Sequence, residues 1–150
     1  MNNKQNLISF LPYDKPFLFV DEIVDVRDGF IKGHYTFPKD AEFYKGHFKH
    51  KPVTPGVLLT ECAAQITLAC YGIFKMKNEN LKADIAITSS EMEFLKLSYP
   101  EEKLLVIGEE IYFRFKKLKM AVKIYNPNQT LIAKGELAGM IIDSKSKDYE

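Results

Sequence analysis

A run of apolar residues that begins just after Pro55 is the feature that most limits how this chain can fold. Thr54 is a suitable helix N-cap, and Pro55 suits the first helical position because an amide proton there would lack a partner. Along the helix, apolar side chains fall on almost every face: Val57, Leu58, Leu59, Cys62, Ala63, Ala64, Ile66, Leu68, Ala69, Cys70 and Tyr71. A helix that is hydrophobic all round must be enclosed by the rest of the protein. We therefore expect a buried helix that begins at about Pro55.

The segments on either side of this run have the pattern of β-strands. Residues 17–26 are rich in β-forming residues, Asp28-Gly29 is a turn signal, and residues 30–37 resume the alternation, which predicts a β-hairpin. Four further strands are expected at about 85–97, 104–116, 118–126 and 130–142, with turn-forming residues between them. The pattern predicts an α+β fold in which one antiparallel sheet packs against one buried helix.

The chain is expected to form a single domain over residues 1–150. Its 150 residues, 46% of them hydrophobic, are enough for one continuous core, and no internal repeat or linker is visible. We expect the polar ends, residues 1–6 and 144–150, to be frayed.

Charge and composition argue against several classes of function. The formal net charge is only +1, and only two of the 21 basic side chains are arginines, so we expect no nucleic-acid partner. The N-terminus lacks the apolar core of a signal peptide, and we expect no membrane span of roughly 20 apolar residues. The sequence predicts a cytoplasmic protein.

The two cysteines are expected to be structural. Cys62 and Cys70 are eight residues apart on the expected helix. This spacing separates them by about 12 Å along the axis, beyond the reach of a disulfide. We predict free, buried thiols, and no paired-cysteine spacing indicates a metal site.

Glu61 and His47 are the candidate catalytic residues. A carboxylate is costly to bury in an apolar helix, which leaves Glu61 either at a water-facing edge or with a chemical role. Gln65 lies one turn further along the same face, where it can orient that carboxylate. His47 is by itself compatible with a single structural hydrogen bond, but Gly46 beside it permits an unusual backbone and Phe48 can anchor it.

The start of the expected helix offers a site for an oxyanion. The amides of Gly56 and Val57 lie in the first turn, where no carbonyl of the helix can reach them and the helix dipole is positive. Gly56 has no side chain, so a carbonyl group can approach its backbone closely. We therefore expect these two amides to hold an oxygen that gains negative charge.

These residues resemble the 3-hydroxyacyl-acyl-carrier-protein dehydratases of the FabZ type. The resemblance covers the lead-in and the region around both candidate residues: Leu11-Pro12, Pro16 to Asp21, Gly46-His47-Phe48, Pro52-Val53, Pro55 to Leu58, and Glu61 with Gln65. It implies a hot-dog fold, in which an antiparallel sheet wraps around one long central helix. A glutamate at position 61 resembles the branch of the family that dehydrates without isomerising the double bond.

The resemblance also implies a mechanism and an assembly. His47 of one subunit would face Glu61 of another in a homodimer, with a trimer of dimers as the larger alternative. His47 would remove the proton next to the thioester carbonyl, the Gly56 amide would stabilise the enolate-like charge, and Glu61 would protonate or orient the departing 3-hydroxyl. Burial by apolar neighbours would raise the pKa of Glu61. No metal and no redox cofactor is expected.

The same resemblance implies a carrier-bound acyl substrate from fatty-acid, polyketide or polyene biosynthesis. Candidate residues for an acyl tunnel are Phe43, Tyr44, Phe94, Tyr99 and Phe113, although aromatic side chains also serve simply as core. Candidate residues for docking an acidic acyl carrier protein are Arg114, Lys116, Lys117 and Lys119, unless they only solvate a hairpin. A hot-dog thioesterase and a non-catalytic acyl-binding subunit are the two alternatives.

Overall fold

The computed structural model describes residues 4–76 and 83–143, and within them the chain folds as one antiparallel sheet around one helix. The strands are β1 (Glu22–Arg27), β2 (Phe30–Thr36), β3 (Ala83–Phe94), β4 (Lys103–Arg114), β5 (Lys117–Tyr125) and β6 (Leu131–Asp143). Their order across the sheet is β1-β2-β4-β5-β6-β3, and every neighbouring pair is antiparallel. The four predicted strands after Asp84 and the first hairpin are confirmed, except that the first strand begins at Glu22 and not at Phe17 as predicted.

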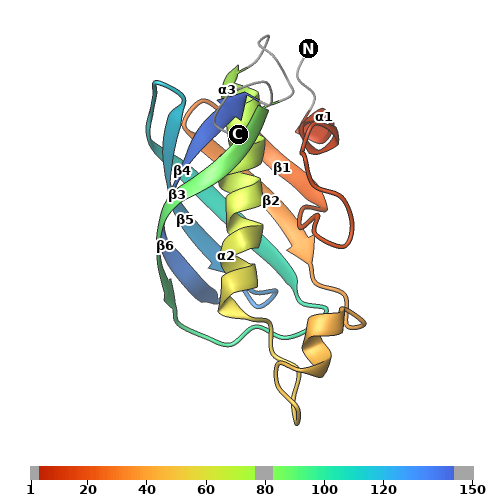
Figure 1. Cartoon of the computed structure of the whole chain (residues 1–150). Coiled ribbons are helices and arrows are strands. Elements are labelled where there is room, and N and C mark those ends of the chain that lie inside the picture. The colour runs from red at the N-terminus through yellow and green to blue at the C-terminus, as the bar shows by residue number, and fades with distance from the viewer. Residues whose placement is uncertain (1–3, 77–82, 144–150) are drawn as a thin grey trace.

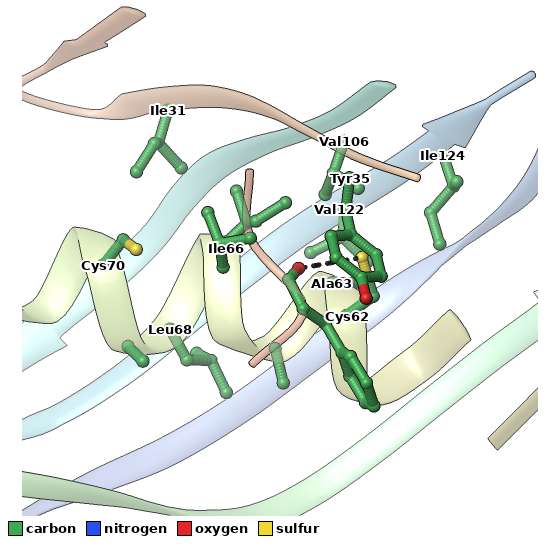
Figure 2. Packing of buried hydrophobic residues seen from close by; sticks show 14 of the residues in the cluster. Ile31, Tyr35, Cys62, Ala63, Ile66, Leu68, Cys70, Val106, Val122 and Ile124 are labelled. Carbon is green, nitrogen blue, oxygen red and sulfur yellow. Dashed lines mark hydrogen bonds between the residues drawn. The ribbon is translucent and has the colours of Figure 1, made fainter. Parts of the chain in front are cut away.

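The central helix consists of three consecutive parts. These are α2 (Gly56–Ala64), a π-helical stretch η2 (Gln65–Cys70) and α3 (Tyr71–Met76). The sheet curls around this helix (Figure 1). In the core, Ile66, Leu68 and Cys70 of the helix pack among side chains of the surrounding strands (Figure 2), and each of the three is 0% exposed. The predicted burial of the helix is confirmed.

The helix begins slightly differently from the prediction. Pro55 is the N-cap, with extended backbone and no side-chain capping bond, and Gly56 is the first helical residue. Thr54 does not cap the helix, because its hydroxyl is hydrogen-bonded instead to the Tyr44 hydroxyl at 2.6 Å. The first amides of the helix are therefore left without a side-chain acceptor.

The helix from Gly56 to Met76 has the length and the apolar composition of a membrane span. It contains 21 residues, and 72% of its most apolar window is buried inside the protein. The expectation of no membrane span stays a prediction, because a buried core helix has the same length and composition. Its burial inside the sheet is what is typical of a core helix.

The N-terminal segment is more ordered than predicted. Residues 4–6, expected to be frayed, belong to α1 (Lys4–Ser9), which packs beside β1. The Lys4 ammonium donates to the carbonyl of Val24 at 2.9 Å. The other predicted frayed residues, 1–3 and 144–150, lie outside the described residues.

Both cysteines are free and buried, as predicted. The Cys62 thiol donates to the carbonyl of Phe19 at 3.5 Å (Figure 2). Burial raises the pKa of the Cys62 and Cys70 thiols well above the usual range. Both side chains are therefore core residues with no thiolate chemistry at neutral pH.

Candidate active site

Glu61 is a partly buried carboxyl group on the second turn of α2. Its Oε2 accepts a hydrogen bond from Nε2 of Gln65 at 3.0 Å. Burial raises the pKa of Glu61, and the hydrogen bond from Gln65 acts in the opposite direction by stabilising the carboxylate. The side chain therefore holds its proton to higher pH than an exposed glutamate, as a general acid requires.

Gln65 connects Glu61 to the lead-in segment before β1. Its side chain is completely buried, and its Oε1 accepts from the amide of Phe19 at 2.7 Å. Its Nε2 donates to the carbonyl of Phe17 at 2.9 Å as well as to Glu61. The segment from Phe17 to Asp21 is not a strand, and Gln65 is hydrogen-bonded to two of its backbone groups, the amide of Phe19 and the carbonyl of Phe17. These two groups are therefore not available to pair with a neighbouring strand. Gln65 thus fixes both the carboxyl group and the chain that packs beside it.

A cavity of about 350 Å³ opens beside Glu61. Its other lining residues come from the lead-in, the central helix and β3, and they are Tyr13, Phe17, Ala64, Leu68, Ile85 and Ile87. Apart from Glu61 and the Tyr13 hydroxyl, the lining side chains are apolar. This composition suits an extended hydrocarbon chain whose reacting group lies beside the carboxyl group of Glu61.

His47 lies in a closed loop between η1 (Glu42–Lys45) and α2. The amide of Val53 donates to the carbonyl of His47 at 2.8 Å, and Phe48 and Lys51 exchange two backbone hydrogen bonds across a tight turn. The imidazole ring stacks on Phe48 with 4.1 Å between the ring centroids. The turn and the stacking hold the histidine in one orientation.

The hydrogen bond of the imidazole fixes which ring nitrogen is available for chemistry. Nδ1 of His47 is 2.8 Å from the carbonyl oxygen of Val53. Because a carbonyl can only accept, Nδ1 carries the proton and donates it, which leaves Nε2 of the neutral ring as a proton acceptor. The loop therefore leaves Nε2 of His47 able to accept a proton, which is what a general base requires.

The N-terminus of α2 lies directly after this loop. The amides of Leu58 and Leu59 both donate to the carbonyl of Pro55, so Gly56 and Val57 precede the first hydrogen bonds of the helix. The first turn contains no acidic residue and no side-chain cap. The positive end of the helix is thus uncompensated, as an oxyanion site requires.

Within one chain, the two candidate catalytic residues do not form a pair. His47 is hydrogen-bonded to Val53 and Glu61 to Gln65, and no hydrogen bond or ion pair joins them in the described part of the chain. The gold segment that holds the histidine loop projects beyond the sheet, past the start of α2 (Figure 1). Each of the two candidate residues is therefore held by a hydrogen bond of its own.

The five aromatic residues predicted for an acyl tunnel lie outside the cavity beside Glu61. Phe43 packs on Phe37 and Tyr44, and Tyr44 is 5% exposed. The ring of Phe94 covers Gly56, Lys51 lies over Tyr99, and Lys75 lies over Phe113. Their packing accounts for Phe43 and Tyr44 as core, and a tunnel role for the five stays a prediction.

The residues that do line the cavity were largely missed by sequence reasoning. Tyr13 lies in the lead-in and was given no role, and Phe17 was assigned to the first predicted strand. Leu68, Ile85 and Ile87 were assigned only to a helix and a strand. One signal was available: Leu68 follows Glu61 by seven residues, which places both on one helix face.

The four basic residues predicted to dock a carrier protein lie on one hairpin. It joins β4 and β5, and we call residues 111–119 the basic hairpin; it contains four of the 21 basic side chains and no acidic one. Lys119 forms an ion pair with Glu136 at 3.3 Å, whereas Arg114, Lys116 and Lys117 are exposed. At the turn, the side chain of Phe115 is 91% exposed, and the hairpin lies at the opposite end of the sheet from the histidine loop (Figure 1).

Comparison with known proteins places the chain among acyl-chain enzymes. Residues 11–137 match the family model of the FabA-like domain. The chain is 32% identical to the 3-hydroxyacyl-[acyl-carrier-protein] dehydratase FabZ of Acinetobacter baylyi over 136 residues, which are 89% of this chain and 86% of the relative. It is 30% identical to the FabZ of Methylobacterium radiotolerans over 146 residues, which are 92% and 88% of the two chains.

Solved structures of similar fold include both dehydratases and thioesterases. The dehydratase heterocomplex ApeI:P from Xenorhabdus doucetiae matches with a TM-score of 0.76 at 14% identity, covering 92% of this chain and 91% of that chain. A thioesterase from Haemophilus influenzae matches with a TM-score of 0.70 at 12% identity, covering 98% and 95%. At these identities the likeness establishes the fold alone, and it confirms the predicted hot-dog fold.

Proposed function

The chain belongs to the FabA-like domain family, and we infer that it is a 3-hydroxyacyl-[acyl-carrier-protein] dehydratase of the FabZ type. It removes water from a 3-hydroxyacyl thioester and leaves a trans-2-enoyl thioester. The observation that carries this inference is the pair of complementary groups: a histidine whose Nε2 is free to accept a proton, and a glutamic acid whose pKa is raised by burial.

In the proposed reaction, the C2 proton of the substrate passes to Nε2 of His47. The electron pair of the broken C–H bond forms the C2=C3 double bond, the C3–O bond breaks, and the departing hydroxyl takes the proton of Glu61 and leaves as water. The amides of Gly56 and Val57 hold the thioester oxygen while it bears negative charge. A neutral Glu61 is needed for the last step, so the burial that raises its pKa contributes directly to the rate.

The proposed enzyme is a homodimer in which His47 of one subunit works with Glu61 of the partner subunit. Support comes from the separate hydrogen-bond partners of the two groups within one chain and from the free edge of β3, which pairs only with β6 among the described strands. An exposed edge strand is a ready site for pairing with a second copy. A two-fold axis at this edge would make an isologous, closed dimer.

Antiparallel pairing of two β3 strands would bring the two half-sites together. Phe94, at one end of β3, contacts Gly56 at the start of the helix, whereas Ile85, near the other end, contacts Gly72. Across a two-fold axis, the histidine-loop end of one subunit therefore lies beside the Ile85 end of the other. That end opens onto the cavity beside Glu61. A larger assembly, such as a trimer of dimers, is compatible with this arrangement.

We propose that an acyl carrier protein delivers the substrate to the basic hairpin. An acidic carrier complements the charges of Arg114, Lys116 and Lys117, and in the proposed dimer the basic hairpin lies at the same end as the histidine loop of the partner subunit. Phe115, which the sequence did not single out, adds an exposed apolar contact at the centre of these charges.

The proposed pathway is a fatty-acid or a polyketide-type route, including polyene synthesis. Comparing turnover of a saturated with that of a conjugated 3-hydroxyacyl chain discriminates between these routes. The conjugated chain is flat and rigid, so it makes different demands on the shape of the cavity. A cytoplasmic location follows from the same proposal and stays a prediction. Thioester hydrolysis is the second candidate reaction, since thioesterases share the fold.

Mass spectrometry of carrier-bound acyl chains after incubation with the protein tests the proposed function. Dehydration lowers the mass of the 3-hydroxyacyl carrier by one water, and we expect this product from the wild-type protein. His47→Ala should abolish it while the protein stays folded and dimeric, and Glu61→Gln should do the same. Release of the free carrier thiol without an enoyl product would refute the dehydratase and favour the thioesterase.

A further inference from the structure

One peptide group connects His47 to the segment that follows β3. The carbonyl of Val53 accepts from Nδ1 of His47 at 2.8 Å. The amide of Thr54, which belongs to the same peptide group, donates to the carbonyl of Ser98 at 2.8 Å. Because a trans peptide group is planar, its N–H and its C=O point in opposite directions. The orientation of this single group therefore decides whether the imidazole keeps its acceptor.

A pair of buried hydroxyl groups anchors the same peptide group at Thr54. The hydroxyls of Tyr44 and Thr54 are hydrogen-bonded at 2.6 Å, and the two residues are 5% and 3% exposed. Tyr44 belongs to η1, which leads into the histidine loop, and the amide of His47 donates to the carbonyl of Phe43 in η1 at 3.0 Å. Thr54 ends the loop, two residues before α2 begins. The hydroxyl pair therefore ties the two ends of the loop together at its base.

Packing alone does not account for these two hydroxyls. Replacing both partners of a buried hydrogen bond by apolar groups of the same shape is close to neutral for stability. Phenylalanine and valine would fill the same space, but they would lack the fixed direction of a hydrogen bond. Burial raises the pKa of Tyr44, against the opposing effect of its bond to Thr54, so the phenol stays neutral near pH 7 and the bond persists.

We propose that Tyr44 and Thr54 are positioning residues for His47, because their hydrogen bond keeps the Val53 carbonyl in place as the acceptor for Nδ1. The proposal rests on the proposed function, which makes His47 the base. A neutral imidazole carries its proton on either nitrogen, and only the form protonated on Nδ1 has Nε2 free. Without the hydroxyl pair, the peptide group can turn about its remaining bond to Ser98, and the form protonated on Nε2 gains population. That form cannot take the C2 proton of the substrate.

Tyr44→Phe and Thr54→Val each remove one hydroxyl, and the double variant removes both. We expect all three to lower kcat about tenfold, which corresponds to about one net hydrogen bond. KM should change by less than about twofold, because neither residue lines the cavity. The double variant should lose no more kcat than either single variant, since the two hydroxyls act as a unit. It leaves neither hydroxyl buried without its partner, so it tests the proposal even if a single variant fails to fold.

Kinetics on a 3-hydroxyacyl carrier protein and nitrogen NMR of isotope-labelled histidine give two independent measurements. At about pH 8.5, where histidine is ordinarily neutral, NMR distinguishes the protonated from the unprotonated ring nitrogen and so reports the tautomer of His47. The chain has three histidines, and His34, whose Nδ1 is 3.2 Å from the carbonyl oxygen of Leu104, is the internal reference. Thr67→Val is the matched control for Thr54→Val, because Thr67 is also buried but its hydroxyl donates within the helix. Thr54→Ser keeps the hydroxyl and should recover most of kcat.

The outcomes separate the positioning role from the proposed function. A lower kcat with a change of His47 toward the form protonated on Nε2, and neither change in Thr67→Val, supports the positioning role. Wild-type kcat in the folded double variant, or an unchanged His47 spectrum, overturns it. The NMR measurement does not need turnover. If the wild-type protein forms no enoyl product but His47 still changes tautomer in the variants, the hydroxyl pair holds the ring and the proposed dehydration is refuted.

Discussion

Replacing Gln65 by methionine tests how the carboxyl group of Glu61 is held. The two side chains are similar in length, but methionine cannot reproduce the three hydrogen bonds that Gln65 makes to Phe19, Phe17 and Glu61. The buried amide of Phe19 would lose its acceptor, which costs about 1–3 kcal/mol, and the bond to the Phe17 carbonyl contributes about 1 kcal/mol. We expect Gln65→Met to lower the free energy of unfolding by about 3 kcal/mol.

The same substitution should change the pH dependence of turnover in a defined direction. The hydrogen bond from Gln65 stabilises the ionised form of Glu61 and so lowers its pKa, while burial raises it. Removing that bond leaves burial unopposed, so the pKa rises further. If Glu61 must be protonated to release the hydroxyl, the alkaline limb of the kcat profile moves to higher pH.

Thermal unfolding and a pH profile of kcat measure the two effects. A loss of about 3 kcal/mol corresponds to about 6–12 °C in Tm for a chain of this size. Thr67→Val is the control, because Thr67 is also completely buried but its hydroxyl donates only to the carbonyl of Ala63, within the helix. If Gln65→Met is no less stable than Thr67→Val and leaves the alkaline limb in place, Gln65 does not position Glu61.

Four further predictions follow from the described contacts. Glu61→Gln should have a higher free energy of unfolding than the wild type at about pH 8 but not at about pH 4. The raised pKa of Glu61 in the folded protein makes its ionisation cost stability at the higher pH. Denaturant unfolding at both pH values measures this difference. Phe115 and Lys116 both have positive φ, so Phe115→Asn with Lys116→Gly should raise Tm by about 4 °C. The same double variant should raise KM severalfold for carrier-bound substrate but not for a pantetheine thioester. A thiol reagent should label neither Cys62 nor Cys70 until the protein unfolds, and labelling at the rate of a free thiol in the native state would contradict their burial.

The sheet and the helix were predictable because their signals are local. Alternation of apolar and polar residues fixes which face of a strand is buried, and an all-apolar helix can only be central. The start of the helix was less predictable, since the capping role of Thr54 depended on where its hydroxyl points. A tertiary contact with Tyr44 decided that, and no local pattern contains it.

The candidate site was predictable as residue types but not as geometry. A lone carboxylate among apolar residues marked Glu61, and the spacing of Gln65 indicated its partner. The tautomer of His47 depends on the carbonyl of Val53, whose direction is set by the fold of the loop. The cavity is less predictable still, because the lead-in, the helix and β3 each contribute only two or three of its lining residues. These segments are far apart in the sequence.

Three features of the proposed site each reduce the stability of the isolated chain. The carboxyl group of Glu61 is partly desolvated, the N-terminus of α2 has neither a side-chain cap nor an acidic residue in its first turn, and the β3 edge has no partner among the described strands. A thioester oxygen would satisfy the helix amides, a hydroxyl would accept the proton of Glu61, and a second subunit would cover the edge. In the proposed dimer, the groups that are unsatisfied in the free chain are therefore the ones that the substrate and the partner subunit would complete, which would tie catalysis to assembly.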